Sequence, residues 1–139
     1  MLRAVVDPGV LISAFLFPGG PPARLYLLWI GGEFEIIACP RLLHELDTVL
    51  RRPTFRRHAT LEQVDTFVDA VRRNADMRSD PASVPALSRD PKDDYLIALA
   101  RAARADALVS GDRDLTELTT IVPPVRTPAE FLATVEAGR

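Results

Sequence analysis

Four acidic side chains stand at junctions between predicted strands and helices of this 139-residue chain. They are Asp7, Glu45, Asp94 and Asp112. Asp7 and Asp112 each follow a short apolar run, Asp94 begins a long apolar segment, and Glu45 lies in a predicted helix that follows another apolar run. Because open α/β sheets bind ligands at the carboxyl ends of their strands, we expect these carboxylates at one edge of a sheet.

Converging carboxylates repel one another. At a separation of about 4 Å and an effective dielectric constant near 20, each pair repels by about 4 kcal/mol. A bound cation removes this repulsion, and oxygen ligands suit a hard ion such as Mg²⁺ or Mn²⁺. The chemistry that such a cluster supports is metal-assisted hydrolysis of a phosphodiester, which needs no side-chain nucleophile.

Strands alternate with helices along the chain. The predicted strands are residues 2–6, 34–38, 107–110 and 118–122, with an edge strand at 75–78. The predicted helices are residues 10–17, 23–30, 40–52, 61–74, 95–105 and 128–135. This alternation predicts a mostly parallel central sheet of four to five strands with helices on both faces.

Capping signals place several helix starts. Thr60 is a candidate N-cap with Glu62 and Gln63 near the capping-box position, and Thr127 with Glu130 follows the same pattern. Asp90 and Asp93 precede the predicted helix at 95–105 and could serve simply as its N-caps, since acids are favoured before a helix. Glu45 also has an alternative to a site role, since a Glu in a helix is most often a solvated surface residue.

Composition indicates one domain spanning residues 1–139. The single cysteine, Cys39, excludes an internal disulfide. No secretory signal and no apolar run of membrane-spanning length is visible, so we expect a cytoplasmic protein without membrane association. The net charge is −2, and Lys92 is the only lysine.

Arginines cluster where two predicted helices meet. Arg51, Arg52, Arg56 and Arg57 lie in one short stretch and are candidates for contact with RNA phosphates. The alternative is that they are solvated side chains near helix ends, where positive charge complements the helix dipole.

Several enzyme classes lack their signatures here. No nucleophile elbow of a serine hydrolase and no glycine-rich phosphate cradle after the first strand occurs in the sequence. One cysteine and two distant histidines do not form a typical closed zinc site.

The order of the motifs resembles the PIN domain, and within it the VapC-like toxins of bacterial toxin–antitoxin pairs. The resemblance is carried by residues 5–14, by the helix bearing Glu45 before 49–55, by 89–96, by 110–115 and by 127–132. It therefore covers nearly the whole chain and implies a PIN-like three-layer α/β sandwich.

The resemblance also implies a function. PIN-domain toxins of this kind are Mg²⁺- or Mn²⁺-dependent endoribonucleases, inhibited by a cognate antitoxin and usually homodimeric. When the acidic positions of the family's motifs are transferred to this sequence, the resemblance implies a catalytic, metal-binding quartet of Asp7, Glu45, Asp94 and Asp112. Asp7 and Asp94 would be the principal ligands, and Glu45 and Asp112 would bind a second ion or orient water. The residues expected to support them are Asp93, Ser110 and Asp114.

One departure from the family pattern concerns the residues after Asp7. The family usually has a hydroxyl residue and then Asn there, whereas this chain has Pro8 and Gly9. Loss of such supporting groups typically lowers metal affinity or activity by about 10- to 100-fold. A catalytically weakened module that binds an antitoxin or RNA is therefore the main alternative, and a receiver-like phosphatase or nucleotide-binding protein is a third.

Overall fold

A five-stranded parallel sheet forms the centre of the computed structural model, which describes residues 1–82, 84, 86 and 91–138. The strands are β1 (Arg3–Val6), β2 (Glu35–Ala38), β3 (Asp76–Met77), β4 (Ala107–Val109) and β5 (Val125–Arg126). They are arranged in the order β3-β2-β1-β4-β5, and every neighbouring pair is parallel. The predicted α/β class and parallel sheet are confirmed.

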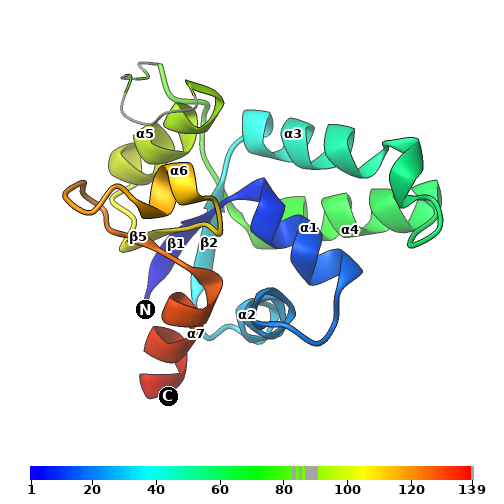
Figure 1. Cartoon of the computed structure of the whole chain (residues 1–139), viewed down its shortest axis with the longest axis horizontal. Coiled ribbons are helices and arrows are strands. Elements are labelled where there is room, and N and C mark those ends of the chain that lie inside the picture. Colours follow the sequence, from blue (N-terminus) through cyan, green and yellow to red (C-terminus); the bar gives the residue numbers. More distant parts are fainter. Residues whose placement is uncertain (83, 85, 87–90, 139) are drawn as a thin grey trace.

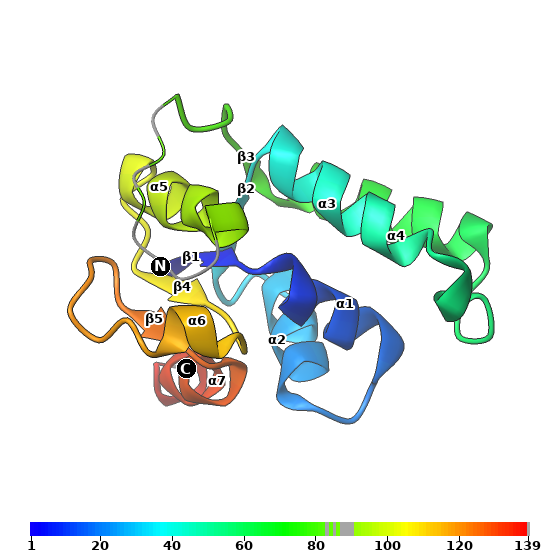
Figure 2. The same ribbon diagram turned by 45° about the horizontal axis from the view of Figure 1, so that its top comes forward.

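Helices cover both faces of this sheet. They are α1 (Pro8–Leu16), α2 (Pro21–Ile30), α3 (Pro40–Leu50), α4 (Leu61–Asn74), α5 (Asp94–Ala102), α6 (Arg113–Thr116) and α7 (Pro128–Ala137), with 3-10 turns at Pro53–Phe55 and Pro91–Asp93. Figure 2 shows α5 on one side of the strands and α2 and α7 on the other, while α3 and α4 pack together and extend away from the sheet (Figure 1). The result is the expected three-layer sandwich.

The core is built from two kinds of segment: apolar runs that are buried along most of their length, and helices that bury one face. Strands β1 and β4 are buried along most of their length, as the inner strands of a parallel sheet must be. Helix α5 is buried from Asp94 to Ala100. Helix α4 instead buries one stripe, and Thr60 and Gln63 cap its first turn reciprocally. In the part of the chain that the structure describes, no helix has the length and apolarity that crossing a bilayer requires.

Two features of the sheet differ from expectation. The strand predicted at 118–122 is wrong, because those residues form bends and irregular structure and the last strand is β5. Val125 pairs with Leu108 instead and fills the core, and this pairing with β4 places the last strand. The predicted edge strand is present as β3, shortened to two residues.

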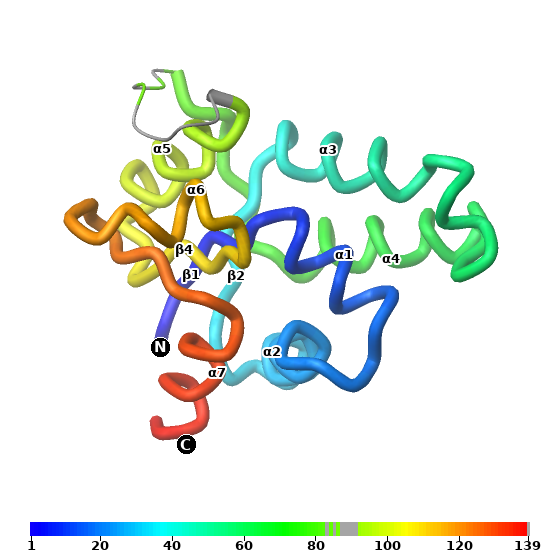
Figure 3. The backbone as a smooth tube through the Cα atoms, viewed as in Figure 1, coloured from blue at the N-terminus to red at the C-terminus, as the bar shows by residue number. Residues whose placement is uncertain are grey.

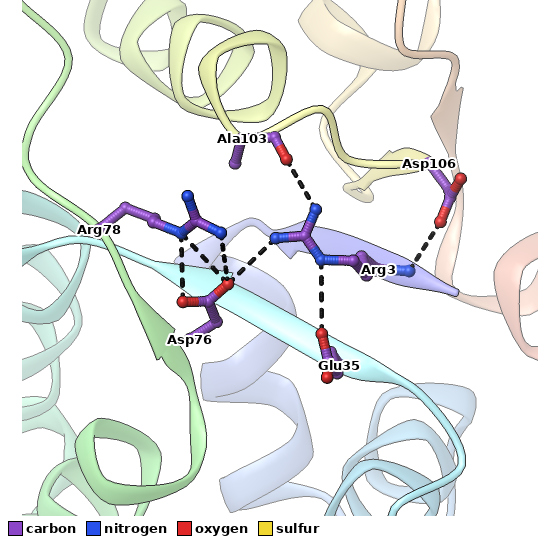
Figure 4. Close-up of polar contacts among 6 residues, drawn as sticks. All are labelled: Arg3, Glu35, Asp76, Arg78, Ala103 and Asp106. Atoms are coloured by element: carbon purple, nitrogen blue, oxygen red, sulfur yellow. Dashed lines mark hydrogen bonds and ion pairs between the residues drawn. The ribbon is translucent and has the colours of Figure 1, made fainter. Parts of the chain in front are cut away.

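An arginine holds the first strands together near the start of β1. The Nη2 of Arg3 donates to Asp76 at 3.0 Å, its Nη1 donates to the carbonyl of Ala103 at 2.7 Å, and its Nε lies 3.4 Å from Glu35 (Figure 4). The backbone N–H of Arg3 donates to Asp106 at 2.8 Å. We call Arg3, Glu35, Asp76, Arg78 and Asp106 the Arg3 network. It links β1 to β2, β3 and the residue before β4.

Candidate active site

Asp7 is held at the carboxyl end of β1. Its Oδ1 accepts a hydrogen bond from the N–H of Gly9 at 2.9 Å, so the side chain caps α1, which Pro8 opens. Its Oδ2 accepts from the hydroxyl of Ser110 at 2.8 Å. Both carboxylate oxygens are therefore oriented by neutral donors, and no cationic side chain takes part in these two bonds.

A chain of hydrogen bonds continues from Ser110 along the next strand end. The Oγ of buried Ser110 accepts from the N–H of Asp112 at 3.0 Å, and Oδ1 of Asp112 accepts from the N–H of Asp114 at 2.9 Å. Asp112 thus caps α6 as Asp7 caps α1. The ends of β1 and β4 are adjacent because these strands pair directly.

The surroundings make ionised Asp7 costly. Burial raises the pKa of the Asp7 carboxyl, and the negative charge of Asp112 raises it further. The hydrogen bonds from Gly9 and Ser110 act in the opposite direction without reversing the shift. Such a balance is typical of carboxylates that bind a ligand or take part in chemistry.

Glu45 is linked to the start of α5 by Tyr95, the residue after Asp94. The hydroxyl of Tyr95 donates to Oε1 of Glu45 at 3.2 Å, and Glu45 is half-buried rather than a solvated surface residue. Burial raises the pKa of the Tyr95 phenol, with the charges of Glu45 and, more weakly, Asp7 adding to the shift. Asp94 lies immediately before Tyr95 in the first turn of α5 and is only 2% exposed.

Tyr95 is the residue that sequence reasoning missed. It was counted as the first residue of an apolar helix, and it is indeed completely buried. A tyrosine in such a helix carries a hydroxyl that needs a partner in the core, and this requirement was the signal that could have identified it.

Three of the four acids, Asp7, Asp112 and Glu45, line two cavities at this end of the molecule. Asp7 and Asp112 lie on the walls of a cavity of about 350 Å³ between the starts of α1 and α6. Glu45 and Asp93 line a second one of about 480 Å³ beside α3. Figure 3 shows helices α1, α3 and α6 following the ends of β1, β2 and β4. Asp93 precedes α5 without capping it through its side chain, and Asp90 lies outside the described residues.

The donor set fits a hard divalent ion. Among the described residues, no three Asp, Glu, His or Cys side chains come close enough together to enclose a metal. Mg²⁺ does not need such an enclosure, since it keeps several waters and binds through one or two carboxylates. Asp7 and Asp112 supply two carboxylates that share a cavity and repel each other. A cation there would remove the repulsion.

The four arginines singled out from the sequence have different surroundings. Arg51 forms ion pairs with Asp47 and Asp65, and Arg56 donates to the carbonyl of Leu50. Arg57 is exposed, and Arg52 lines the cavity that contains Glu45.

The departure after Asp7 has a defined geometry. Gly9 supplies its backbone N–H to Asp7 but no side chain. A Cβ added at Gly9 would lie 3.6 Å from Oδ1 of Asp7, which is ordinary van der Waals contact. A Cβ would therefore fit at this position, beside the carboxylate.

Comparison with known proteins agrees with this fold. The chain is similar in structure to PAE2754 from Pyrobaculum aerophilum, with a TM-score of 0.65 and 15% identity over 98% of this chain and 90% of that one. It is also similar to VapBC2 from Rickettsia felis bound to a DNA fragment from their promoter, with a TM-score of 0.62 and 13% identity over 91% and 98% of the two chains. These likenesses show a shared fold. No curated protein sequence matches this chain significantly.

The family follows from the sequence match. The family model of the PIN domain matches residues 3–114, well over half of the 139 residues. This range contains the ends of β1 and β4, helix α3 and the start of α5, which carry the four acids. The chain therefore belongs to the PIN-domain family.

Proposed function

We propose that this protein is a Mg²⁺- or Mn²⁺-dependent endoribonuclease and the toxin of a type II toxin–antitoxin pair. The observation that carries the proposal is the pair Asp7 and Asp112, whose carboxylates share a cavity and repel each other where parallel strands end. Membership of the PIN family, a family of nucleases, supports the reaction class.

The reaction is hydrolysis of a phosphodiester. Water forms a bond to phosphorus, the bond to the 3′ oxygen breaks, and that oxygen takes up a proton, which leaves a 3′ hydroxyl and a 5′ phosphate. When bound, a divalent ion lowers the pKa of water and stabilises charge on the phosphate and the leaving oxygen. Asp7 and Asp94 would be its main ligands, with Glu45 and Asp112 holding a second ion or orienting water.

The remaining residues hold the acids in place. Ser110 donates to Asp7, and Asp114 donates its N–H to Asp112, so each fixes the direction of a carboxylate. Tyr95 does the same for Glu45. Because burial and neighbouring negative charge keep the Tyr95 phenol protonated, its hydroxyl stays a donor across the working pH range.

The biological setting is proposed from the same family. The R. felis VapBC2 structure contains a DNA fragment from the promoter, which supports a cognate antitoxin as the partner of this chain. A homodimer in the cytoplasm and an RNA substrate complete the proposal. Single-domain organisation over residues 1–139 is part of it.

The decisive experiment compares three Asp-to-Asn variants. We expect Asp7→Asn and Asp94→Asn to lower Mg²⁺- or Mn²⁺-dependent cleavage of labelled RNA by at least about 100-fold, beyond the loss typical of supporting residues. Asp69→Asn in α4 is the matched control and should retain wild-type cleavage. Cleavage that survives in both site variants, or that persists in EDTA, would disprove the proposal.

A specific observation favours a second candidate. Gly9 provides no side chain beside Asp7, so the protein could bind RNA or an antitoxin with a weakened centre. A folded wild-type protein that is neither stabilised by Mg²⁺ or Mn²⁺ nor active on RNA would establish this candidate.

A further inference from the structure

A groove with an excess of positive charge runs beside Glu45. It has a volume of about 480 Å³ and lies between α3 and the segment that leads into α5. Three cationic side chains, Arg41, Arg52 and Lys92, line it together with two carboxylates, Glu45 and Asp93. The whole chain, by contrast, carries a net charge of −2.

The neighbouring groove between α3 and α4 has the opposite balance. Three acids, Asp47, Asp65 and Asp69, line it with two arginines, Arg51 and Arg72. Arg51 is engaged by Asp47 and Asp65, and Arg72 lies 3.5 Å from Asp69. Of these two grooves, only the one beside Glu45 suits an anionic ligand.

The cations beside Glu45 follow one side of α3. Arg41, Glu45, Thr48 and Arg52 are spaced by four, three and four residues, which is the repeat of one helix face. Arg52 follows the last helical residue by two positions, and its N–H still bonds back to the carbonyl of Val49. At a rise of about 1.5 Å per residue, the two arginines are about 16 Å apart along the helix. Glu45 lies between them.

Among the described residues, no hydrogen-bond acceptor engages the guanidinium groups of Arg41 and Arg52. Arg41 lies over the ring of Tyr95, with its Cζ 4.2 Å from the ring centroid, an arrangement that holds the cation without occupying its N–H groups. Within the described parts of the chain, neither guanidinium has a carboxylate at ion-pair distance, although other arginines do. A planar guanidinium with free edge donors matches two phosphate oxygens.

We infer that this groove binds the backbone of a single-stranded RNA along α3, with one phosphate at Arg41 and another at Arg52 on either side of the phosphate near Glu45. The inference rests on the proposed nuclease function and deepens it. Contacts to phosphate carry no base information, so the groove sets where the strand lies and in which direction it crosses the acids. Base selection would come from other parts of the surface.

The test measures binding apart from cleavage. The affinity of a fluorescently labelled single-stranded oligoribonucleotide is followed by anisotropy in EDTA over a series of salt concentrations. We expect Arg41→Gln/Arg52→Gln to weaken binding by about 10-fold or more, and to lower the slope of log K against log salt by about 1.4, since each lost phosphate contact on a single strand contributes about 0.7.

The matched control removes the same charge elsewhere. Arg24→Gln/Arg73→Gln breaks surface pairs with Glu136 and Asp69 outside the groove, and it should leave both affinity and slope unchanged. Thermal unfolding of each variant checks that it is folded.

Three results would overturn the inference: an unchanged slope in Arg41→Gln/Arg52→Gln, an equal loss in both double variants, or unchanged RNA affinity with lost binding of an acidic peptide such as polyglutamate. The nuclease proposal fails separately. A wild-type protein that binds RNA through this groove but never cuts it supports the groove and disproves the nuclease.

Discussion

Carboxylates at the two ends of β1 have different partners and opposite pKa shifts. At its start, Arg3 contacts Asp76 and Glu35, and Arg78 contacts Asp76 as well. The hydrogen bonds from Arg78 and Arg3 hold the pKa of the Asp76 carboxyl below its usual range. At the end of the same strand, Asp7 accepts hydrogen bonds, among the described residues, from a backbone N–H and a hydroxyl, and burial and Asp112 raise its pKa.

The difference separates structural acids from candidate functional ones. Asp76 has its counterions within the fold, so it stabilises the sheet and leaves no charge for a ligand. Asp7 and Asp112 repel each other and lack such counterions in the contacts described above. A partly buried carboxylate without a counterion among the described residues is a site where an external cation gains binding energy.

The largest effect on stability is expected at the Arg3 network. Arg3→Met removes one of the two arginines that contact Asp76, the arginine beside Glu35 and the donor to the carbonyl of Ala103. Because the Arg3 side chain is 25% exposed, we expect the free energy of unfolding to fall by about 3 kcal/mol, the lower limit for breaking a buried pair. Urea denaturation measures it. Arg24→Met, which breaks the surface pair with Glu136, should lose less than about 1 kcal/mol.

A divalent ion should stabilise the opposite end of the strand. At 100 times its dissociation constant, Mg²⁺ or Mn²⁺ should raise the free energy of unfolding by about 2.7 kcal/mol. The melting temperature of wild-type protein and of the Asp69→Asn control would rise with added ion, whereas that of Asp7→Asn would not. An equal rise in Asp7→Asn would place the ion elsewhere.

The two ends should also respond differently to pH. Because the pKa of Asp7 is raised in the folded protein, its ionised form destabilises the fold at neutral pH, and this penalty disappears as pH falls through the raised pKa. The metal-induced rise in melting temperature should be lost over the same range, since the ligand takes up a proton. Asp76 has the opposite sign: its contribution is present above the ordinary carboxyl pKa of about 3.9 and is lost only as pH falls through its lowered value. Melting curves recorded with and without Mn²⁺ between neutral and acidic pH measure both effects. If the Asp76 contribution were lost at a higher pH than the Mn²⁺-induced rise in melting temperature, the prediction would be wrong.

Removing one hydroxyl tests the second half of the site. Tyr95→Phe keeps the ring under Arg41 but deletes the bond to Glu45. We expect RNA cleavage to fall by about 10-fold, as for other residues that orient a ligand, with little change in RNA affinity. A change in KM alone would indicate that Tyr95 acts only through Arg41. Tyr26→Phe is the control, because Tyr26 lies in the aromatic cluster of α2 and α4.

The smallest expected effect is a gain. Gly9→Asn places an amide beside Asp7, where there is room for a Cβ, and should raise cleavage or metal affinity several-fold, toward the 10-fold that such groups contribute. Gly9→Ala adds the Cβ without the amide and should give no gain. Equal activity of the two variants and wild type would show that Gly9 does not limit this site.

Local signals were enough for several elements. Helix α4 begins and ends where predicted, since Thr60 and Gln63 form a capping box and the buried stripe repeats at helical spacing. The last strand was placed wrongly, because β5 is only two residues long and owes its existence to pairing with β4. Such long-range pairing leaves little trace in the local sequence.

The candidate site shows the same division. Asp7 and Asp112 could be chosen from the sequence, because a carboxylate directly after an apolar strand cannot pack into the core and must face the edge of the sheet. Glu45 could not be distinguished from a surface residue by its position in α3. Its half-buried state and its bond from Tyr95 depend on α5 packing beside α3.

By itself, the sequence determined the alternation of strands and helices, the parallel class of the sheet and the acids at its carboxyl edge, because periodicity and capping act over a few residues. Only the tertiary structure decided which charges are neutralised. Arg3 meets Asp76 across 73 residues, Ser110 meets Asp7 across 103, and Tyr95 meets Glu45 across 50. Such contacts are set by how the layers pack, and no local pattern encodes them.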